Sequence, residues 1–267
     1  MASLVSSHGS RPPRAIVRAV GALMLREMST SFGRVSGGYL WALLQPIGGV
    51  AIMTLVFSFA FRNPPIGNNF ALFYATGLVP LGMYQDINQK LATALRFSRP
   101  LLAYPSVTFM DALIGRVLLN ALTQALVFFI VFTGIMLFTD ARAVIDMTAI
   151  MRAFLMLLAL SLGVGVTNCF LQGVFPVWQQ IWSILNRPLF IISGIFFVID
   201  YMPRYARELL LWNPVAHPIM EMRAGFFPTY EAVYVSEVYV YGVAGSLSVF
   251  GLLMLYRYHD WLLNERM

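Results

Sequence analysis

The chain has 267 residues, of which 59% are hydrophobic and only 11% are charged. Soluble domains carry about 25% charged residues, so this composition excludes an ordinary soluble protein and indicates a membrane protein. The net charge is +6, and the basic residues are scattered at the ends of apolar stretches, which argues against a nucleic-acid-binding face. The single cysteine, Cys169, excludes an intrachain disulfide and a multi-cysteine metal site.

A helical period begins at Arg14 and continues to Met28. At 100° per residue, one arc holds apolar side chains and the other holds arginines and alanines, which predicts an amphipathic helix in the membrane interface. A plain basic tail is the alternative. The apolar arc consists of Ile16, Val17, Val20, Leu23 and Met24.

The first apolar stretch, Gly37 to Phe61, carries no Asp, Glu, Lys, Arg or His. As a helix, its residues reach about 37 Å, which exceeds the bilayer core of roughly 30 Å. It opens with paired glycines, and we expect them to allow a sharp turn from the interfacial helix into the span. Pro46 lies one turn inside and is expected to kink the helix.

Five further apolar stretches follow, and the fifth is interrupted by Pro188 and Gly194. We therefore predict an all-α, six-span bundle over residues 37–256, with cytoplasmic segments at 1–36 and 257–267. The segment from Tyr201 to Gly225 is expected to form one or two short re-entrant or interfacial helices. The five stretches are Phe70–Ile87, Ala112–Phe138, Phe154–Phe175, Leu185–Ile199 and Val233–Tyr256.

Basic residues predict the orientation of the chain. With the N-terminus inside, 12 of the 18 Lys and Arg residues fall in cytoplasmic segments. Six spans with both termini in the cytoplasm satisfy the positive-inside rule.

The segment between the second and third stretches, Asn88 to Tyr104, predicts a short helix with Leu91 and Leu95 on one face. Tied to two spans, such a helix is suited to press into a groove on a soluble partner. A positive-inside anchor with no further role explains the same residues.

The sequence offers no enzyme site. It contains no G-x-x-x-x-G-K-[ST] phosphate loop, so energy from ATP must come from a partner. His217 and Glu221 share a helical face, but two ligands do not make a metal site, and a capping or packing pair is the simpler interpretation. Asp86 and Asp111 lie near the predicted cytoplasmic ends of their spans, which argues against an ion-coupled carrier.

Two segments carry a family resemblance. The run R-E-M-S-T-S-F-G-R-V-S-G-G-Y-L-W-A-L-L-Q-P, Arg26 to Pro46, resembles the start of the first span of type-2 ABC exporter permeases. Within that class it is similar to the capsular polysaccharide (KpsM-type) export permeases. W-N-P-V-A-H-P-I-M-E-M-R-A-G-F-F, Trp212 to Phe227, is similar to their segment between spans five and six.

This resemblance implies a bacterial inner-membrane homodimer bound to two cytoplasmic P-loop ATPase subunits, which bind ATP and Mg²⁺. The chain itself would need no cofactor. A lipid-linked capsular polysaccharide would pass outward, into a periplasmic adaptor and an outer-membrane conduit. Alternatives are export of O-antigen, teichoic acid or a small drug, and a membrane enzyme or scaffold of another class. Arg14–Ser31 would form the interface helix, Asn88–Tyr104 the coupling helix and Tyr201–Gly225 the periplasmic gate helices.

Aromatic rings pack on the C–H faces of sugars without fixing one register, so we expect an aromatic channel with arginines at its mouths. Membrane-interface anchoring of the aromatics and topology anchoring of the arginines remain alternatives. The expected channel residues are Arg34, Tyr39, Trp41, Gln45, Phe57, Phe61, Arg187, Phe190, Phe196, Phe197 and Tyr201. The expected ATPase-coupling residues are Lys90, Leu91, Leu95, Arg96 and Arg99, and those of the gate are Trp212, Asn213, His217, Glu221 and Arg223.

Overall fold

The computed structural model describes residues 13–31, 38–102, 107–139, 141 and 143–264, and within them all regular elements are helices. The predicted all-α class is therefore confirmed for the described chain. In order, the elements are α1 (Pro13–Ser31), α2 (Gly38–Ala60), α3 (Phe70–Ala92), α4 (Ala94–Leu102), α5 (Phe109–Phe138), α6 (Met147–Val174), α7 (Trp178–Ile192), η1 (Ile199–Tyr201), α8 (Arg204–Leu210), α9 (Ala216–Ala224) and α10 (Glu237–Asn264).

Polar caps set where three of the helices begin. Asn69 caps α3 through its side chain. Thr108 and Asp111 form a reciprocal capping box at the start of α5, and the Asp146 side chain accepts two backbone N–H groups at the start of α6. These contacts satisfy donors that the first turn of a helix leaves unpaired.

Helix α6 is the centre of the bundle and packs against α10 and α3. In the 18-residue apolar window of α6, 61% of the residues are buried inside the protein. In the corresponding window of α2, only 6% are buried. A Cβ at Gly163 would collide with the carbonyl of Ala244 on α10, so the missing side chain permits close packing. Thr167 Oγ1 then donates to the Leu247 carbonyl at 2.8 Å. Small residues and hydroxyl bonds of this kind join helices within membranes.

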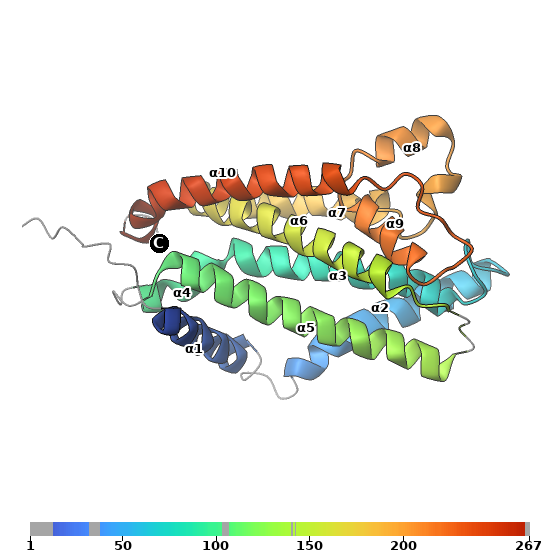
Figure 1. The fold of residues 1–267 in the computed structure, drawn as a ribbon, viewed down its shortest axis with the longest axis horizontal. Coiled ribbons are helices and arrows are strands. Elements are labelled where there is room, and N and C mark those ends of the chain that lie inside the picture. The colour runs from blue at the N-terminus through green and yellow to red at the C-terminus, as the bar shows by residue number, and fades with distance from the viewer. Residues whose placement is uncertain (1–12, 32–37, 103–106, 140, 142, 265–267) are drawn as a thin grey trace, which may run out of the picture.

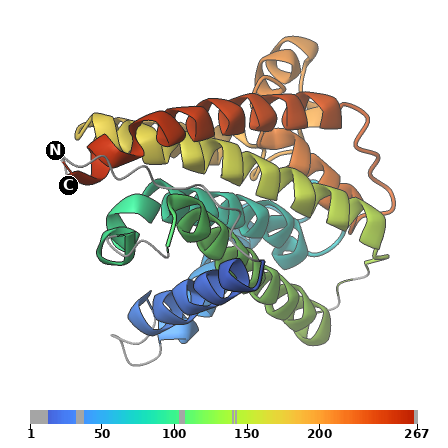
Figure 2. The same ribbon diagram turned by 60° about the vertical axis from the view of Figure 1, so that its left-hand side comes forward.

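The two ends of the bundle differ (Figures 1 and 2). At one end, here the α4 end, lie α1, α4 and the C-terminal part of α10; the opposite end, here the α8 end, carries α8 (Figure 1). Helix α1 packs across α5, with Val20 and Leu23 of the apolar arc buried (Figure 2). Val17 from the same arc is 71% exposed and lies off this contact.

Four helices in the described chain are long and apolar enough to cross a membrane. The prediction of six spans also counts α3 and α7 as membrane-spanning helices. Helix α7 has 15 residues, about 22 Å at the helical rise. The second half of α3 carries Asp86 and Lys90 among amides, which lowers its hydropathy. The four helices correspond to Leu40–Ala60, Phe109–Phe138, Met147–Val174 and Glu237–His259.

The predicted boundaries of the fifth stretch are wrong. The helix covers Trp178–Ile192 and not Leu185–Ile199, because polar glutamines in its first turn hide its start in the sequence. It ends before Gly194, whose φ of +78° suits glycine. Arg187 therefore lies inside the helix and not at its beginning.

Candidate functional site

A small pocket with a volume of about 270 Å³ lies between the first half of α2 and its neighbouring helices. Helices α2, α3, α5 and α7 all contribute to its wall. Its polar side chains are Gln45 from α2, Gln85 and Asp86 from α3, and Gln124 from α5, and the ring of Phe190 from α7 adds an aromatic face.

Two glycines, which carry no side chain, leave space for this pocket. Gly49 on α2 and Gly82 on α3 both line it, and a Cβ added at either would meet nothing within 4 Å. Pro46 also lies at the wall, inside α2, where its ring removes one backbone donor from the helix. The space is therefore built into the backbone packing of α2 on α3.

The polar groups of the pocket can both donate and accept hydrogen bonds. Gln124 Nε2 donates to Asp86 Oδ2 at 2.6 Å, which orients the carboxylate. Asp86 and Gln45 are exposed, so acceptor and amide positions remain open to a ligand. Carboxylates accept hydrogen bonds, and amides both donate and accept them. Among the described residues, no group of three or more His, Cys, Asp or Glu is placed to hold a metal ion.

The structure brings together only some of the predicted channel residues. Gln45 and Phe190 share the pocket. Phe57 lies 5.7 Å from Phe196 and 6.0 Å from Phe61 between ring centroids, so these rings form an aromatic group toward the α8 end.

The other predicted channel residues lie apart from the pocket. Trp41 is 62% exposed on α2, Arg187 is exposed on α7, and Tyr201 is 66% exposed in η1. Phe197 packs beside Ile199 and α9. Arg34 and the side chain of Tyr39 lie outside the described residues.

Gln85, Asp86 and Gln124 were not predicted as channel residues. Asp86 lies near the predicted end of its span, and that position in the sequence does not reveal its partner, Gln124. The available signal was a polar side chain within an apolar stretch, since such residues usually face the bundle interior and serve function. Gln124 in α5 fits that rule.

At the α4 end, Arg116 joins four helices. Its Nε lies 3.1 Å from Glu27 Oε2 of α1, and both side chains are 4% exposed. Its Nη1 donates to Thr93 Oγ1 at 3.0 Å and to the Lys90 carbonyl at the end of α3. The guanidinium also lies 4.2 Å from the ring centroid of Phe97 on α4. In the sequence, Arg116 is only one of the twelve basic residues of the predicted cytoplasmic segments.

The predicted coupling residues divide into two faces. Leu91 and Leu95 are buried, at 0% and 1% exposure, but they lie on different helices. The predicted start of the coupling helix is wrong, because residues 88–92 belong to α3 and α4 begins at Ala94; Leu95 is the leucine that fixes the first turn of α4 to the bundle. Arg96 and Arg99 are exposed on α4. Lys90 is half-buried at the end of α3. An arginine face is thus presented outward on a firmly seated helix.

Toward the α8 end, Arg223 of α9 is fully buried. Its guanidinium donates to the carbonyls of Phe197 at 2.8 Å and Ile195 at 2.9 Å, and it lies 4.4 Å from the Phe73 ring centroid. Burial lowers the pKa of Arg223 to about 10, so it stays charged at neutral pH. This residue ties α9 to the turn after α7.

The remaining gate residues have separate partners. His217 and Glu221 have different polar partners: His217 bonds the Leu211 carbonyl, while Glu221 pairs with Arg152 of α6 at 2.6 Å. Asn213 Nδ2 donates to Ser193 Oγ at 3.0 Å. Trp212 is 76% exposed.

The family model and the similar proteins point to the same kind of transporter, and the similar proteins match about nine-tenths of the chain. The family model described as "ABC-2 type transporter" matches residues 18–227. The polysialic acid transport protein KpsM of Escherichia coli is 29% identical over 238 residues, covering 89% of this chain and 92% of KpsM. The capsule polysaccharide export inner-membrane protein CtrC of Neisseria meningitidis serogroup B is 24% identical over 241 residues, covering 90% and 91% of the two chains. BexB of Haemophilus influenzae, with the same description as CtrC, is 26% identical over 239 residues, covering 89% and 90%. Because the family model spans more than half of the chain, the protein belongs to the ABC-2 type transporter family.

Proposed function

We propose that this chain is the permease subunit of an ATP-driven exporter that moves lipid-linked capsular polysaccharide across the bacterial inner membrane. The observation that carries the proposal is similarity over about nine-tenths of both chains to transport proteins named for polysialic acid and capsule polysaccharide. The pocket supports it with amide and carboxylate side chains and the ring of Phe190, because sugars offer hydroxyls at their edges and apolar C–H faces.

The working assembly is a homodimer with two ATPase subunits, which bind the ATP and Mg²⁺. Helices α3 and α7 would complete the six spans, with both termini in the cytoplasm. No residue within α7 is buried, and α2 exposes most of its apolar surface. A second copy of the chain would cover these two helices, which flank the polar pocket, and would convert the open pocket into part of a channel wall.

In this assembly α4 is the coupling helix. Closure of the ATPase dimer would push on its arginine face, and Arg116 would carry the displacement to α1 and α5 through its buried contacts. Helices α8 and α9 would form the periplasmic gate, beyond which an adaptor and an outer-membrane conduit receive the polymer.

Deletion of the gene and complementation test this function. We expect loss of surface polysaccharide and accumulation of the lipid-linked polymer inside the cell, both reversed by the wild-type chain. The purified complex with its ATPase should hydrolyse ATP faster with lipid-linked capsular glycan than with O-antigen, teichoic acid or drugs. Unchanged surface polysaccharide, or stimulation by a drug alone, would contradict the proposal.

A further inference from the structure

Helix α7 is held by polar side chains at its two ends. At the α4 end, Trp178 Nε1 donates to Asn168 Oδ1 of α6 at 2.8 Å. At the other end, Asn213 Nδ2 donates at 3.0 Å to Oγ of Ser193, the residue that follows the last turn of α7. No residue within α7 is buried. The helix is therefore fixed at both ends and carries no buried side chain between them.

Asn168 also joins this attachment to the last turns of α3. Its Nδ2 donates to Asn88 Oδ1 at 3.1 Å, and both asparagines are 1% exposed. A Cβ at Gly165, one turn earlier on α6, would lie 2.6 Å from the Cβ of Leu91, so the glycine lets α6 approach α3 closely here. Three polar side chains thus form a continuous connection from α3 through α6 to α7.

The part of α3 that contains Asn88 leads directly into the proposed coupling helix, since α4 begins at Ala94. Two residues after Asn88, the Lys90 carbonyl accepts a hydrogen bond from Arg116. Two buried networks therefore meet in front of α4. Arg116 leads to α1 and α5, whereas Asn168 leads to α6 and α7. A displacement of α4 reaches α7 through the second network.

The other end of α7 leads to the proposed gate helices. Asn213, which bonds Ser193, lies between α8 and α9. Arg223 of α9 donates to the carbonyls of Phe197 and Ile195 in the turn after α7. Ser193 and Arg223 are both 0% exposed. Buried polar contacts therefore connect α7 to the gate helices as well as to the coupling end.

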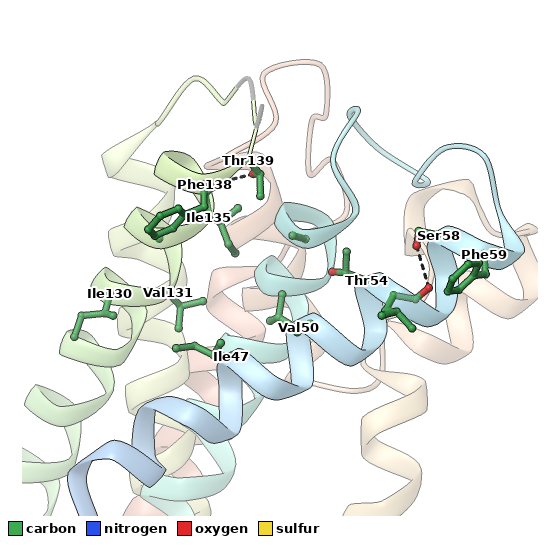
Figure 3. Close-up of a pocket in the computed structure, with 14 residues that line it drawn as sticks. Ile47, Val50, Thr54, Ser58, Phe59, Ile130, Val131, Ile135, Phe138 and Thr139 are labelled. Atoms are coloured by element: carbon green, nitrogen blue, oxygen red, sulfur yellow. Dashed lines mark hydrogen bonds between the residues drawn. The ribbon is translucent and has the colours of Figure 1, made fainter. Parts of the chain in front are cut away.

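Helix α2 is poorly placed to carry the same movement. A groove with a volume of about 810 Å³, lined mainly by apolar side chains, separates it from α5. Figure 3 shows Ile47 of α2 and Val131 of α5 facing one another across this groove. Close-packed side chains pass on a displacement, whereas an open space absorbs it. Helix α6, in contrast, packs firmly against α3 and α10 and gives α7 a fixed support.

We propose that α7 transmits the movement of the coupling helix to the gate, and that Asn168 is the positioning residue that makes α7 follow α3. This inference rests on the proposed function and adds the residues that link ATP hydrolysis to gate opening. Loss of the Trp178–Asn168 bond would disconnect α7 from α3 while both ends keep their own folds. ATP hydrolysis would then continue without moving the gate.

The indole N–H of Trp178 can be removed with little other change. In Trp178→Phe an aromatic ring remains, but Asn168 Oδ1 loses its donor. Trp182→Phe is the matched control, because Trp182 lies one turn later on α7 and its Nε1 has no hydrogen-bond partner among the described residues. The same substitution therefore removes a bond at one position and none at the other.

The first measurement is the amount of glycan exported per ATP hydrolysed by the full permease–ATPase complex in proteoliposomes. The substrate is the lipid-linked polymer that accumulates in the deletion strain. In Trp178→Phe this ratio should fall about tenfold, the equivalent of about 1.4 kcal/mol, which is within the cost of leaving one buried acceptor unpaired. Trp182→Phe should keep the wild-type ratio.

The second measurement follows the gate. Nitroxide labels are placed on Tyr205→Cys of the two subunits, because Tyr205 is 86% exposed on α8 and the native Cys169 is buried. Trapping the ATPase with ADP and vanadate should change the distance between the labels in the wild type and in Trp182→Phe. The change should be much smaller in Trp178→Phe, a difference that loss of stability alone would not produce.

A double variant separates transmission from folding. Trp178→Phe combined with Asn168→Leu removes both members of the bond, so neither is left buried and unpaired, and the complex should assemble normally. Export per ATP should nevertheless remain low. Because both single substitutions break the same connection, their effects on this ratio should not add.

A wild-type ratio in Trp178→Phe and in the double variant would overturn the role of the bond, as would an equal loss in Trp182→Phe. An unchanged nucleotide-dependent distance in Trp178→Phe would overturn transmission through α7. Each of these results would leave glycan-stimulated ATP hydrolysis and capsule export by the wild type intact. Failure of the proposed function would instead remove those two activities from the wild-type complex, so the two failures are distinguishable.

Discussion

Removal of either partner of the Glu27–Arg116 ion pair is expected to destabilise the protein strongly. Both side chains are 4% exposed and their charged atoms lie 3.1 Å apart. Removing one member of such a buried pair typically costs about 3–5 kcal/mol, because the other charge is left without a partner. Arg116 has further contacts to Thr93 and Phe97, so its loss should be the larger of the two.

The measurement is a double-mutant cycle with Glu27→Leu, Arg116→Met and both together. The free energy of unfolding is followed by denaturant titration in mixed micelles. The double variant should be more stable than the sum of the single losses predicts, by about 1–3 kcal/mol, since neither charge is then stranded. The complex of each variant with the ATPase is assayed in parallel, because Arg116 contacts the proposed coupling helix.

The exposed pair Arg204–Glu208, with a distance of 2.8 Å, provides the matched control. Its side chains are 85% and 59% exposed, so Glu208→Gln should leave stability unchanged within error. If Glu27→Leu is as mild as Glu208→Gln, or if the single losses simply add, the buried network does not hold α1, α4 and α5 together.

Three further outcomes are expected. Arg96→Glu reverses an exposed charge on α4 and should weaken ATPase binding or stimulation; an unchanged complex would remove the coupling assignment. Trp41→Ala should impair polymer export while membrane insertion stays intact, and wild-type export would contradict a channel role. Burial lowers the pKa of His217, whose Nδ1 accepts the Ser236 N–H at 3.2 Å and whose Nε2 bonds the Leu211 carbonyl at 3.0 Å. The ring is therefore neutral in the folded protein, so its contribution to stability is complete above its usual pKa of about 6.5 and is lost as the pH falls toward the lowered value. Unfolding measured between about pH 5 and 7.5 should show this loss in the wild type and a flatter profile in His217→Gln.

Local pattern was sufficient for much of the helical framework. The apolar stretches predicted α2, α3 and α5 closely, since unbroken hydrophobic runs and caps such as Thr108 and Asp111 depend only on neighbouring residues. A short helix between α3 and α5 was predicted for the same reason, but its predicted leucine face is wrong, since Leu91 belongs to α3 and α4 begins at Ala94. The predicted boundaries of the fifth stretch were wrong for two reasons. Pro188 lies inside α7, although proline normally marks the end of a helix, and glutamines occupy the start of this helix.

The candidate site, by contrast, depends on distant parts of the chain. Asp86 and Gln124 are hydrogen-bonded although 38 positions separate them, and Glu27 and Arg116 are paired across 89 positions. The hydrophobic periodicity of one segment does not reveal which polar residue pairs with which partner, because the pairing depends on how the helices cross. Composition and apolar periodicity thus determined that the chain is an all-helical membrane protein, and the two quoted segments indicated its family. Only helix packing decided which polar side chains share one pocket, because the glycines that open it act through the spacing between helices.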